Sequence, residues 1–260
     1  FDEAFGCNNG HWNDYFDATL RRGSEPEQTQ GYITDVLTEE AMRFIRENRA
    51  APFFCYLSYN APHSPYQVPD KYFDKFKAAG FADNVAAFYG MCENIDDNVG
   101  RLLAHLDDLK LAENTIVLLL TDNGCTAGWK LYAAGMRGAK TSVHEGGSRV
   151  PLLMRWPAAK WAPHVVTEIT SHIDLFPTRM DLCGVQVSTG PQTDGVSLRP
   201  LLEGQLDAPW PERVLFTHNP IDETNKFPGA VRTQTHRLVR EIKGAGGGSK
   251  AKANDASATP

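Results

Sequence analysis

The feature that most constrains this sequence is an uninterrupted apolar run that ends in polar residues. Residues 116–120 are all aliphatic, and Thr121, Asp122, Asn123 and Gly124 follow them. A run of this kind between turn-forming residues is typical of a strand buried on both faces of a mostly parallel sheet. Ligands of open α/β sheets collect where strands end at the carboxyl edge. Asp122 and Asn123 therefore fit either oxygen ligands of a hard cation or an ordinary turn.

A second apolar run, residues 53–57, has strand composition and is followed by a proline-rich loop. Pro62 and Pro65 stiffen this loop, so His63 between them is presented on a backbone with little freedom. A histidine held at a strand end suits proton transfer, because its ordinary pKa lies near neutrality. The alternative is a histidine that only hydrogen-bonds its own loop.

Two stretches carry apolar residues at spacings of three and four, which predict helices. The first predicts a helix over residues 34–48, with Thr34 or Thr38 as its N-cap. The second predicts a long helix over residues 88–108 that packs on the sheet and joins the two strands as a βαβ unit. The acidic pair at residues 96–97 falls on the polar face of that helix, so we expect it to face solvent.

A basic, glycine-rich segment follows Gly124. Between residues 128 and 160 six cations stand against a single acid, Glu145. The segment lacks the pattern of a nucleotide-binding P-loop. Its glycines would let the backbone approach an anion closely, and Lys140 would supply a point charge there. A solvated basic surface is the alternative.

Shorter patterns predict the remaining elements. Residues 150–156 have strand composition, and residues 174–182 predict a short helix with Asp174 as its N-cap and Gly184 just past its end. After a stretch rich in proline and glycine, three segments predict a small antiparallel sheet: residues 213–218, 230–233 and 237–242.

Composition excludes several classes of function. The formal net charge of -6 gives no support to nucleic-acid binding. The five cysteines lie far apart without a CxxC pair, which argues against a zinc site and a disulfide scaffold. No stretch is apolar for long enough to span a bilayer. The chain opens at Phe1 with no charged leader, which we take as a sign that an N-terminal part is missing.

Three strings, in this order, resemble the later signature segments of the type I, formylglycine-dependent sulfatases of the alkaline phosphatase superfamily: YNAPHSPYQVP at 59–69, TDNG at 121–124 and GAKTSVHEGGSRVP at 138–151. The string SHIDLFPT at 171–178 also fits their pattern. The resemblance covers nearly everything from residue 1 to about residue 242. It implies an α/β fold like that of alkaline phosphatase, a mostly parallel sheet flanked by helices, with a small C-terminal antiparallel subdomain.

The resemblance also implies roles for individual residues. Asp122 and Asn123 would be two of the ligands of one divalent cation, Ca²⁺ rather than Mg²⁺. His63 would contact the sulfate and help to protonate the departing alcohol. Lys140 would neutralise the sulfate or the bridging oxygen, and all of these groups are expected to meet at one pocket edge.

The sequence departs from the family in three features that it lacks. The family's nucleophile is a cysteine in CxPSR that is converted to formylglycine, and none of the five cysteines here begins such a segment. The early acidic metal ligands and the early Lys and His segment cannot be placed either. We expect a truncated chain: residues 1–211 the later part of the catalytic domain, 212–243 a partial C-terminal subdomain, and 244–260 a disordered tail.

The predicted function of the parent protein is the hydrolysis of sulfuric esters, as in arylsulfatases. The fragment alone is expected to be inactive. The aromatic and amide groups around His11 and Trp12 would suit a sugar, so a carbohydrate sulfate is one expected substrate. The alternatives are a phosphodiester or phosphonate monoester hydrolase of the same superfamily and a non-catalytic fragment. The resemblance further implies export to the periplasm or the extracellular space.

Overall fold

The computed structural model describes residues 1–7, 12–186, 193–204, 209–218 and 229–241. These residues form two compact units that interleave along the chain. The first unit comprises Phe1–Leu119, Thr126–Tyr132 and Leu153–Lys160, and the second comprises Leu120–Cys125, Ala133–Leu152 and Trp161–Pro260. Among the helices described, none combines the length and the apolar character needed to cross a membrane.

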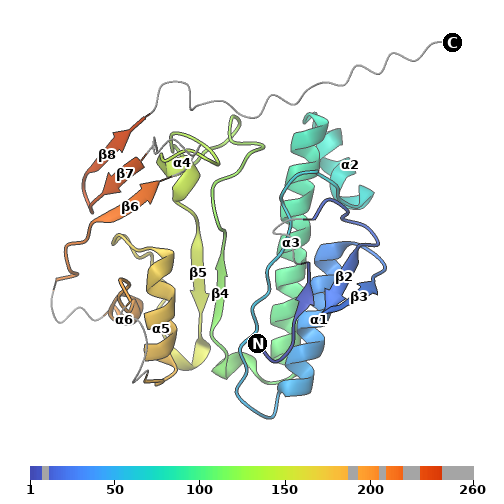
Figure 1. Ribbon diagram of the computed structural model, residues 1–260, viewed down its shortest axis with the longest axis horizontal. Coiled ribbons are helices and arrows are strands. Elements are labelled where there is room, and N and C mark those ends of the chain that lie inside the picture. The colour runs from blue at the N-terminus through green and yellow to red at the C-terminus, as the bar shows by residue number, and fades with distance from the viewer. Residues whose placement is uncertain (8–11, 187–192, 205–208, 219–228, 242–260) are drawn as a thin grey trace. The chain divides into compact units, whose positions relative to one another are not determined.

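The first unit opens with a small antiparallel sheet and a helix (Figure 1). The sheet has the order β1 (Phe5–Gly6), β2 (Thr19–Arg22) and β3 (Glu25–Gln28), and α1 (Ile33–Asn48) follows it. The helix confirms the prediction over residues 34–48. The predicted N-caps are wrong, because Thr34 and Thr38 lie buried inside the helix. There the Thr38 hydroxyl donates to the Thr34 carbonyl, 2.8 Å away.

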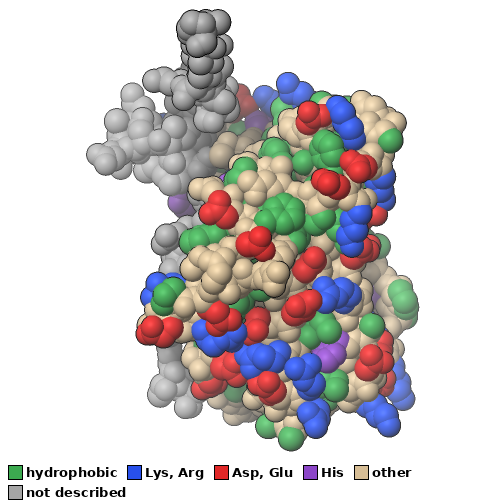
Figure 2. All heavy atoms as spheres, turned by 90° about the vertical axis from the view of Figure 1, so that its right-hand side faces the viewer, with side chains coloured by type: hydrophobic (Ala, Val, Ile, Leu, Met, Phe, Trp, Pro, Cys, Tyr) green, Lys and Arg blue, Asp and Glu red, His purple; other side chains and the backbone are tan. Residues whose placement is uncertain are grey.

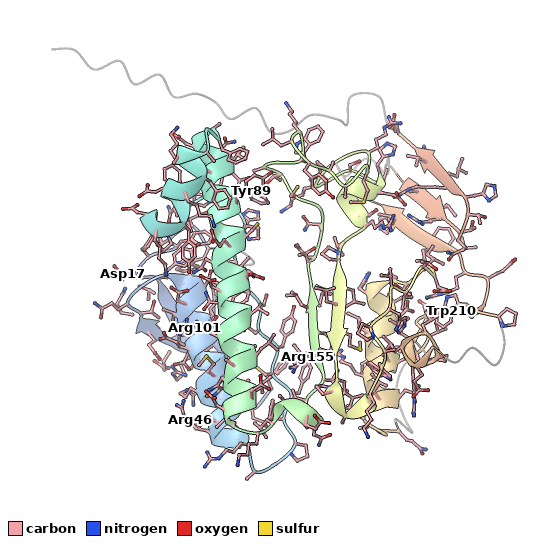
Figure 3. All side chains as sticks on the ribbon, turned by 180° about the vertical axis from the view of Figure 1, so that it is seen from behind. Asp17, Arg46, Tyr89, Arg101, Arg155 and Trp210 are labelled. Atoms are coloured by element: carbon pink, nitrogen blue, oxygen red, sulfur yellow. The ribbon has the colours of Figure 1, made fainter. Side chains whose placement is uncertain are left out.

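Helices α2 (Asp70–Ala78) and α3 (Asp83–Asp108) pack together, and α3 also packs on α1. The long helix is therefore confirmed. Phe53 and Val117, one from each predicted strand, pack against the buried cluster that includes Leu106 of α3. The packing of this helix on a mostly parallel sheet stays a prediction. The buried face of α3 includes Asn94 and Asn98, whose amides donate to the Asp35 carboxylate of α1 at 2.9 and 2.7 Å. Figure 3 shows Arg101 on the same helix, where its guanidinium donates to Asn98 at 2.9 Å.

The apolar stripe that predicted α3 is largely half-buried, because the helix uses a polar seam against α1. The acidic pair at residues 96–97 is exposed, as predicted. The core of the first unit instead gathers around four fully buried side chains, Tyr15, Leu20, Ile33 and Met91. These come from the loop before β2, from β2, from α1 and from α3, so the core ties the N-terminal sheet to both helices.

The two predicted central strands had different outcomes. The first apolar run, residues 53–57, is not a strand. Its side chains alternate between half-buried and exposed, as in an extended segment, but no described strand forms a ladder with it. The second run contains β4 (Val117–Leu120), which pairs with β5 (Leu152–Arg155). In β4, Leu119 and Leu120 are 38% and 40% exposed, so the predicted burial on both faces is also wrong.

The mostly parallel sheet is consequently not seen among the described residues. They form three small sheets, β1–β2–β3, β4–β5 and β6–β7–β8. A short 3-10 turn at Ala112–Asn114 precedes β4, and another at Pro157–Ala159 follows β5. A strand requires a neighbour with which to exchange backbone hydrogen bonds, and an apolar run does not specify that neighbour.

The second unit holds short helices and the C-terminal sheet. The antiparallel sheet predicted near the C-terminus is confirmed as β6, β7 and β8. The predicted tail, residues 244–260, lies outside the described residues. The elements of this unit after β5 are the 3-10 turn His172–Asp174, α5 (Leu175–Leu182), α6 (Arg199–Glu203), β6 (Leu215–His218), β7 (Gly229–Arg232) and β8 (Arg237–Arg240), and α4 (Glu145–Ser148) precedes them.

Asp174 precedes α5 as predicted, but its side chain forms no cap of that helix. It is fully buried and makes a two-pronged ion pair with Arg213, with both N–O distances at 2.7 Å. Its carboxylate also accepts hydrogen bonds from the backbone N–H of Ser171 and Val196. Burial alone would raise the pKa of Asp174, but these bonds and the Arg213 charge hold that pKa below its ordinary value.

Candidate functional site

The first part of the candidate site is the turn after β4 in the second unit. Asp122 is exposed and Asn123 is half-buried. The Asn123 amide donates to one oxygen of the Asp122 carboxylate, so the two side chains lie together. This contact uses an amide N–H and leaves the second carboxylate oxygen and the amide oxygen as acceptors. Asp122 and Asn123 therefore lie in a bend after β4, and their role as ligands of a cation stays a prediction.

The loop that carries Lys140 is bonded directly to this turn. The Gly124 N–H donates to the Gly147 carbonyl, and the Lys140 N–H donates to the Cys125 carbonyl, both at 3.1 Å. Both segments belong to the second unit. The structure therefore brings Lys140 and the Asp122–Asn123 pair into one local arrangement, although they are far apart in sequence.

Glycines make this close contact possible. A Cβ atom on Gly124 would lie under 3.0 Å from the Gly146 carbonyl oxygen. A Cβ on Gly146 would meet the Gly138 carbonyl at such a distance, and one on Gly147 would meet the Ser142 carbonyl. These neighbours are backbone atoms of the same folded loop and cannot swing aside. The glycines expected from sequence to let an anion approach are thus also required for packing.

Lys140 itself is half-buried and forms no ion pair with any residue in the described part of the chain. The single acid of this basic segment, Glu145, is engaged by arginines. It pairs with Arg232 of β7, and it lies 3.8 Å from Arg237 of β8 and 3.9 Å from Arg149. A partly buried cation without a protein counter-ion favours an anionic ligand.

The C-terminal sheet holds the Lys140 loop from outside. Arg237 of β8 donates to the Val143 carbonyl and, at 3.1 Å, to the Ser148 hydroxyl. Burial, and secondarily the charge of Arg232, lowers the pKa of Arg237. This support was missed by sequence reasoning. The signal available there was the repeated arginine in the strands that became β7 and β8, which carried no indication of its partner.

A second link joins the loop to the end of β8. Glu241 accepts from the imidazole Nε2 of His144 at 2.6 Å and from Arg137 at 2.8 Å. The bond from His144, followed by the charge of Arg137, lowers the pKa of Glu241. Glu241 and Arg137 are both well exposed, so this link is open to solvent.

His63 lies in the first unit, in a loop that two buried tyrosines hold. The Tyr15 hydroxyl is 2.7 Å from the His63 carbonyl and 3.1 Å from the Asn60 carbonyl, so one hydroxyl serves both acceptors. The Tyr32 hydroxyl donates to the Gln67 carbonyl at 2.8 Å. Burial raises the pKa of both tyrosines, which keeps each hydroxyl protonated and able to donate. Sequence reasoning missed both tyrosines, because no local pattern marks a partner so distant in the chain.

The His63 ring is oriented by its own loop. Its Nδ1 lies 2.6 Å from the Ser64 carbonyl oxygen, an acceptor, so Nδ1 carries a proton in this arrangement. The role of this ring in proton transfer stays a prediction. The peptide bonds before Pro62 and Pro65 are both cis. His63 belongs to the first unit and the Lys140 arrangement to the second.

Of the two residues expected to contact a sugar, the structure describes Trp12. His11 lies outside the described residues. Trp12 is half-buried and packs against the core cluster that contains Tyr15. Its indole Nε1 is buried and has no hydrogen-bond partner in the described part of the chain.

The oxygen atoms of Asp122 and Asn123 suit a hard cation such as Ca²⁺, which takes 6–8 oxygen ligands. The chemistry of this donor set fits the predicted metal. These two residues supply only part of such a shell, and within the described ranges no three His, Cys, Asp or Glu residues are grouped to hold a metal ion.

Comparisons with protein families place most of this chain. A family model described as Sulfatase matches residues 1–185. A second, described as N-sulphoglucosamine sulphohydrolase, C-terminal, matches residues 139–245. The two matches overlap over the loop that carries Lys140.

Several curated proteins are similar in sequence. An uncharacterized sulfatase of Escherichia coli (strain K12) is 32% identical over 209 residues, covering 78% of this chain and 37% of that protein. Steryl-sulfatase of Mus musculus is 36% identical over 182 residues, with coverage of 67% and 28%. N-acetylgalactosamine-6-sulfatase of Homo sapiens is 30% identical over 235 residues, with coverage of 79% and 42%. The chain thus spans less than half the length of each of these relatives.

Solved structures share the fold. The crystal structure of Ps i-CgsB in complex with k-i-k-neocarrahexaose aligns with a TM-score of 0.83 at 26% identity, covering 93% of this chain and 58% of that chain. A phosphonate monoester hydrolase from Silicibacter pomeroyi aligns with a TM-score of 0.61 at 20% identity, covering 89% and 58%. The second likeness concerns the fold alone.

Proposed function

Because this chain belongs to the sulfatase family of the alkaline phosphatase superfamily, we propose that the protein hydrolyses sulfate esters and that its substrates are sulfated carbohydrates. The observation that carries the proposal is the state of Lys140. This lysine is half-buried, has no counter-ion among the described residues, and is bonded through its backbone to the turn that presents Asp122 and Asn123. A bound sulfate group would neutralise the positive charge of Lys140.

In this proposal each group has a distinct task. Lys140 neutralises the negative charge of the bound sulfate, which otherwise repels a nucleophile. Asp122 and Asn123 would hold Ca²⁺, with Mg²⁺ as the less suitable ion because it demands a stricter octahedral shell. When bound, the cation would supply a further positive charge to the sulfate oxygens.

His63 would act on the leaving group. The contact of its Nδ1 with the Ser64 carbonyl orients the ring, and the imidazolium would deliver a proton to the departing alcohol oxygen. Tyr15 would fix the backbone from which this ring projects.

The nucleophile has no candidate in this sequence. Each of the five cysteines lacks the CxPSR context in which the family forms formylglycine. We therefore expect the 260-residue chain to bind sulfate without turning over an ester. An assay with an aryl sulfate and Ca²⁺ checks this, and turnover well above the buffer rate would contradict it.

Sulfated carbohydrates are the proposed substrate class for two reasons. Relatives of this chain include an N-acetylgalactosamine-6-sulfatase, and Ps i-CgsB was crystallised with a neocarrahexaose. Steryl-sulfatases are also relatives, and this likeness supports a steroid sulfate as the alternative substrate. A comparison of N-acetylgalactosamine 6-sulfate with a steroid sulfate as ligands separates the two, with tighter binding of the sugar expected. Export to the periplasm or extracellular space is proposed on family grounds alone.

A phosphonate or phosphodiester hydrolase is the second candidate, favoured by the shared fold with phosphonate monoester hydrolases. Binding competition between sulfate and methylphosphonate at neutral pH distinguishes them. We expect sulfate to bind more tightly, and the reverse order would support the second candidate.

The direct test of the proposed function is the sulfate affinity of two lysine variants, measured by calorimetry in the presence of Ca²⁺. Lys140→Met should weaken sulfate binding about tenfold or more, equivalent to about 1.4 kcal/mol. Lys130→Met is the matched control, since Lys130 is an exposed lysine of the same basic segment, and it should change the affinity less than about twofold. Equal losses in both variants would contradict the proposal.

A further inference from the structure

A cavity of about 430 Å³ opens on the first unit and has no part in the chemistry described so far. Its lining includes aromatic rings, planar polar side chains and the aliphatic residues Val68 and Ala87. Figure 2 shows the right-hand side of Figure 1, on which exposed hydrophobic side chains lie between acidic and basic ones. The aromatic members are Phe16, Tyr66 and Phe73, and the polar ones are Gln67, Asp83 and Asn84.

The aromatic rings of the cavity are held in place. The Tyr66 hydroxyl is hydrogen-bonded to the Thr126 hydroxyl at 2.7 Å, and its ring meets Phe88 edge-on with centroids 6.0 Å apart. Phe16 packs against Tyr32 at 5.2 Å and is still 45% exposed. Rings fixed in this way offer apolar surface to a ligand with little loss of side-chain freedom on binding.

The polar groups of the cavity retain unused hydrogen-bonding capacity. Gln67 accepts from the Tyr15 N–H through Oε1, which fixes its amide and leaves the NH₂ group as a donor. Lys77 contacts one oxygen of Asp83 and leaves the other as an acceptor. The Asn84 side chain makes no hydrogen bond with any described residue. An alternation of ring faces and planar amide or carboxylate groups matches a pyranose, which has apolar C–H faces and a rim of hydroxyls.

The cavity is also close to His63. Tyr66 follows His63 by three residues in one loop, so their Cα atoms are at most about 11 Å apart. A sugar whose sulfate ester meets His63 would therefore have a neighbouring ring within reach of the cavity. A purely apolar ligand such as a steroid would leave the remaining hydrogen-bonding capacity of Gln67, Asp83 and Asn84 unused.

We propose that this cavity is a subsite for the sugar ring adjacent to the one that carries the sulfate, so that the protein prefers sulfated oligosaccharides to sulfated monosaccharides. This proposal rests on the proposed function. The cavity contributes binding and orientation of the chain, and it takes no part in the cleavage of the ester.

The test uses the 260-residue chain and a fixed set of probes: k-i-k-neocarrahexaose, a chondroitin 6-sulfate hexasaccharide and N-acetylgalactosamine 6-sulfate. Affinities are measured by calorimetry, and binding sites by amide chemical shifts. At least one hexasaccharide should bind about tenfold more tightly than the monosaccharide. It should shift the amide signals of residues 66–68 and 83–87, which the monosaccharide should leave in place.

Two variants keep the test decisive. Asn84→Ala, at an exposed position in the first turn of α3, and Phe16→Ala should each weaken hexasaccharide binding about fivefold or more. Both should leave monosaccharide and sulfate binding unchanged within about twofold. Phe54→Ala, at an exposed phenylalanine outside the cavity lining, is the matched control.

The outcomes separate this proposal from the proposed function. Failure of every hexasaccharide to outbind the monosaccharide, with Lys140-dependent sulfate binding intact, would overturn the subsite and leave the sulfatase proposal standing. Unchanged hexasaccharide binding in Asn84→Ala and Phe16→Ala would overturn it as well. Unchanged sulfate binding in Lys140→Met would instead count against the proposed function.

Discussion

The loops that carry His63 and Lys140 are held by different forces. Around His63, the hydroxyls of buried Tyr15 and Tyr32 bond to backbone carbonyls at both ends of the loop. Around Lys140, glycines allow backbone to pack on backbone, and charged side chains of the C-terminal sheet hold the outside. The first loop thus depends on neutral hydrogen bonds in a core, and the second on close packing and ion pairs.

This difference has a consequence for function. Neutral hydrogen bonds to buried groups respond little to salt, whereas exposed ion pairs are screened. The proposed proton-transfer group, His63, is therefore held by contacts that respond little to salt, while the proposed anion-binding group, Lys140, lies in a loop whose outer supports depend on ionic conditions. We expect the two loops to respond differently to substitution, pH and salt.

The largest effect is expected from Gly147→Ala. The new methyl group would collide with the Ser142 and Ala139 carbonyls, which belong to the loop itself, so we expect a loss of about 5 kcal/mol in the free energy of unfolding. Chemical denaturation measures it. Gly100→Ala, in α3 with open space around it, is the control and should stabilise by up to about 1 kcal/mol. A mild effect at Gly147 would show that packing does not hold this loop.

The next effect separates burial from charge within the second unit. Arg213→Met would leave the Asp174 carboxylate buried and unpaired, which costs about 3 to 4 kcal/mol. Because this ion pair is buried, the loss should persist in 1 M salt. Denaturation at low and high salt measures it, and Arg149→Met, at an exposed arginine of the same unit, is the control.

The same pair predicts a pH dependence with a definite sign. The pKa of Asp174 is below its ordinary value in the folded protein, so its stabilising contribution is complete above about pH 4 and is lost as pH falls through that lowered pKa. Without Arg213, burial would raise this pKa. The stability difference between the natural chain and Arg213→Met should therefore shrink on acidification from pH 6. A difference that grows would contradict the assigned role of the pair.

A smaller effect is expected at the His63 loop. Tyr15→Phe removes the donor shared by the Asn60 and His63 carbonyls and should cost about 1 to 2 kcal/mol, independent of salt. It should also broaden or shift the His63 imidazole signals in NMR spectra. Tyr56→Phe, at an exposed tyrosine of the same unit, should change neither. Salt-dependent loss in Tyr15→Phe would remove the contrast between the loops.

The smallest effect should come from Glu241→Gln. Glu241 is exposed, and its contacts with His144 and Arg137 are open to solvent. We expect sulfate affinity to fall less than about threefold at low salt and the difference to vanish at high salt. Calorimetric titration with sulfate at two ionic strengths measures this. A larger loss that persists in salt would show that the end of β8 fixes Lys140 more strongly than packing does.

Local patterns in the sequence predicted the parts of the fold that depend on local periodicity. The 34–48 helix and the C-terminal antiparallel strands are examples. Residues 53–57 have equally strong strand composition and form no strand, because pairing requires a neighbour that an apolar run cannot specify. The N-cap predictions failed at Thr34 and Thr38 because burial of these side chains took precedence over capping.

The candidate site shows the same division. Motifs identified His63, Asp122, Asn123 and Lys140 as candidates, and the structure brings the last three into one arrangement. The residues that hold them were not predictable. Tyr15 contacts the His63 carbonyl across 48 positions of the chain, and such long-range hydrogen bonds leave no periodic trace in the sequence.

The most direct measurement of the central claim is the coupling between Ca²⁺ and sulfate binding to this chain. If the Asp122–Asn123 turn and Lys140 form one site, Ca²⁺ should raise the sulfate affinity at least about fivefold. Asp122→Ala should abolish that increase while leaving the residual sulfate affinity of Lys140 in place. Sulfate binding that is equal with and without Ca²⁺, or coupling that survives in Asp122→Ala, would contradict the claim.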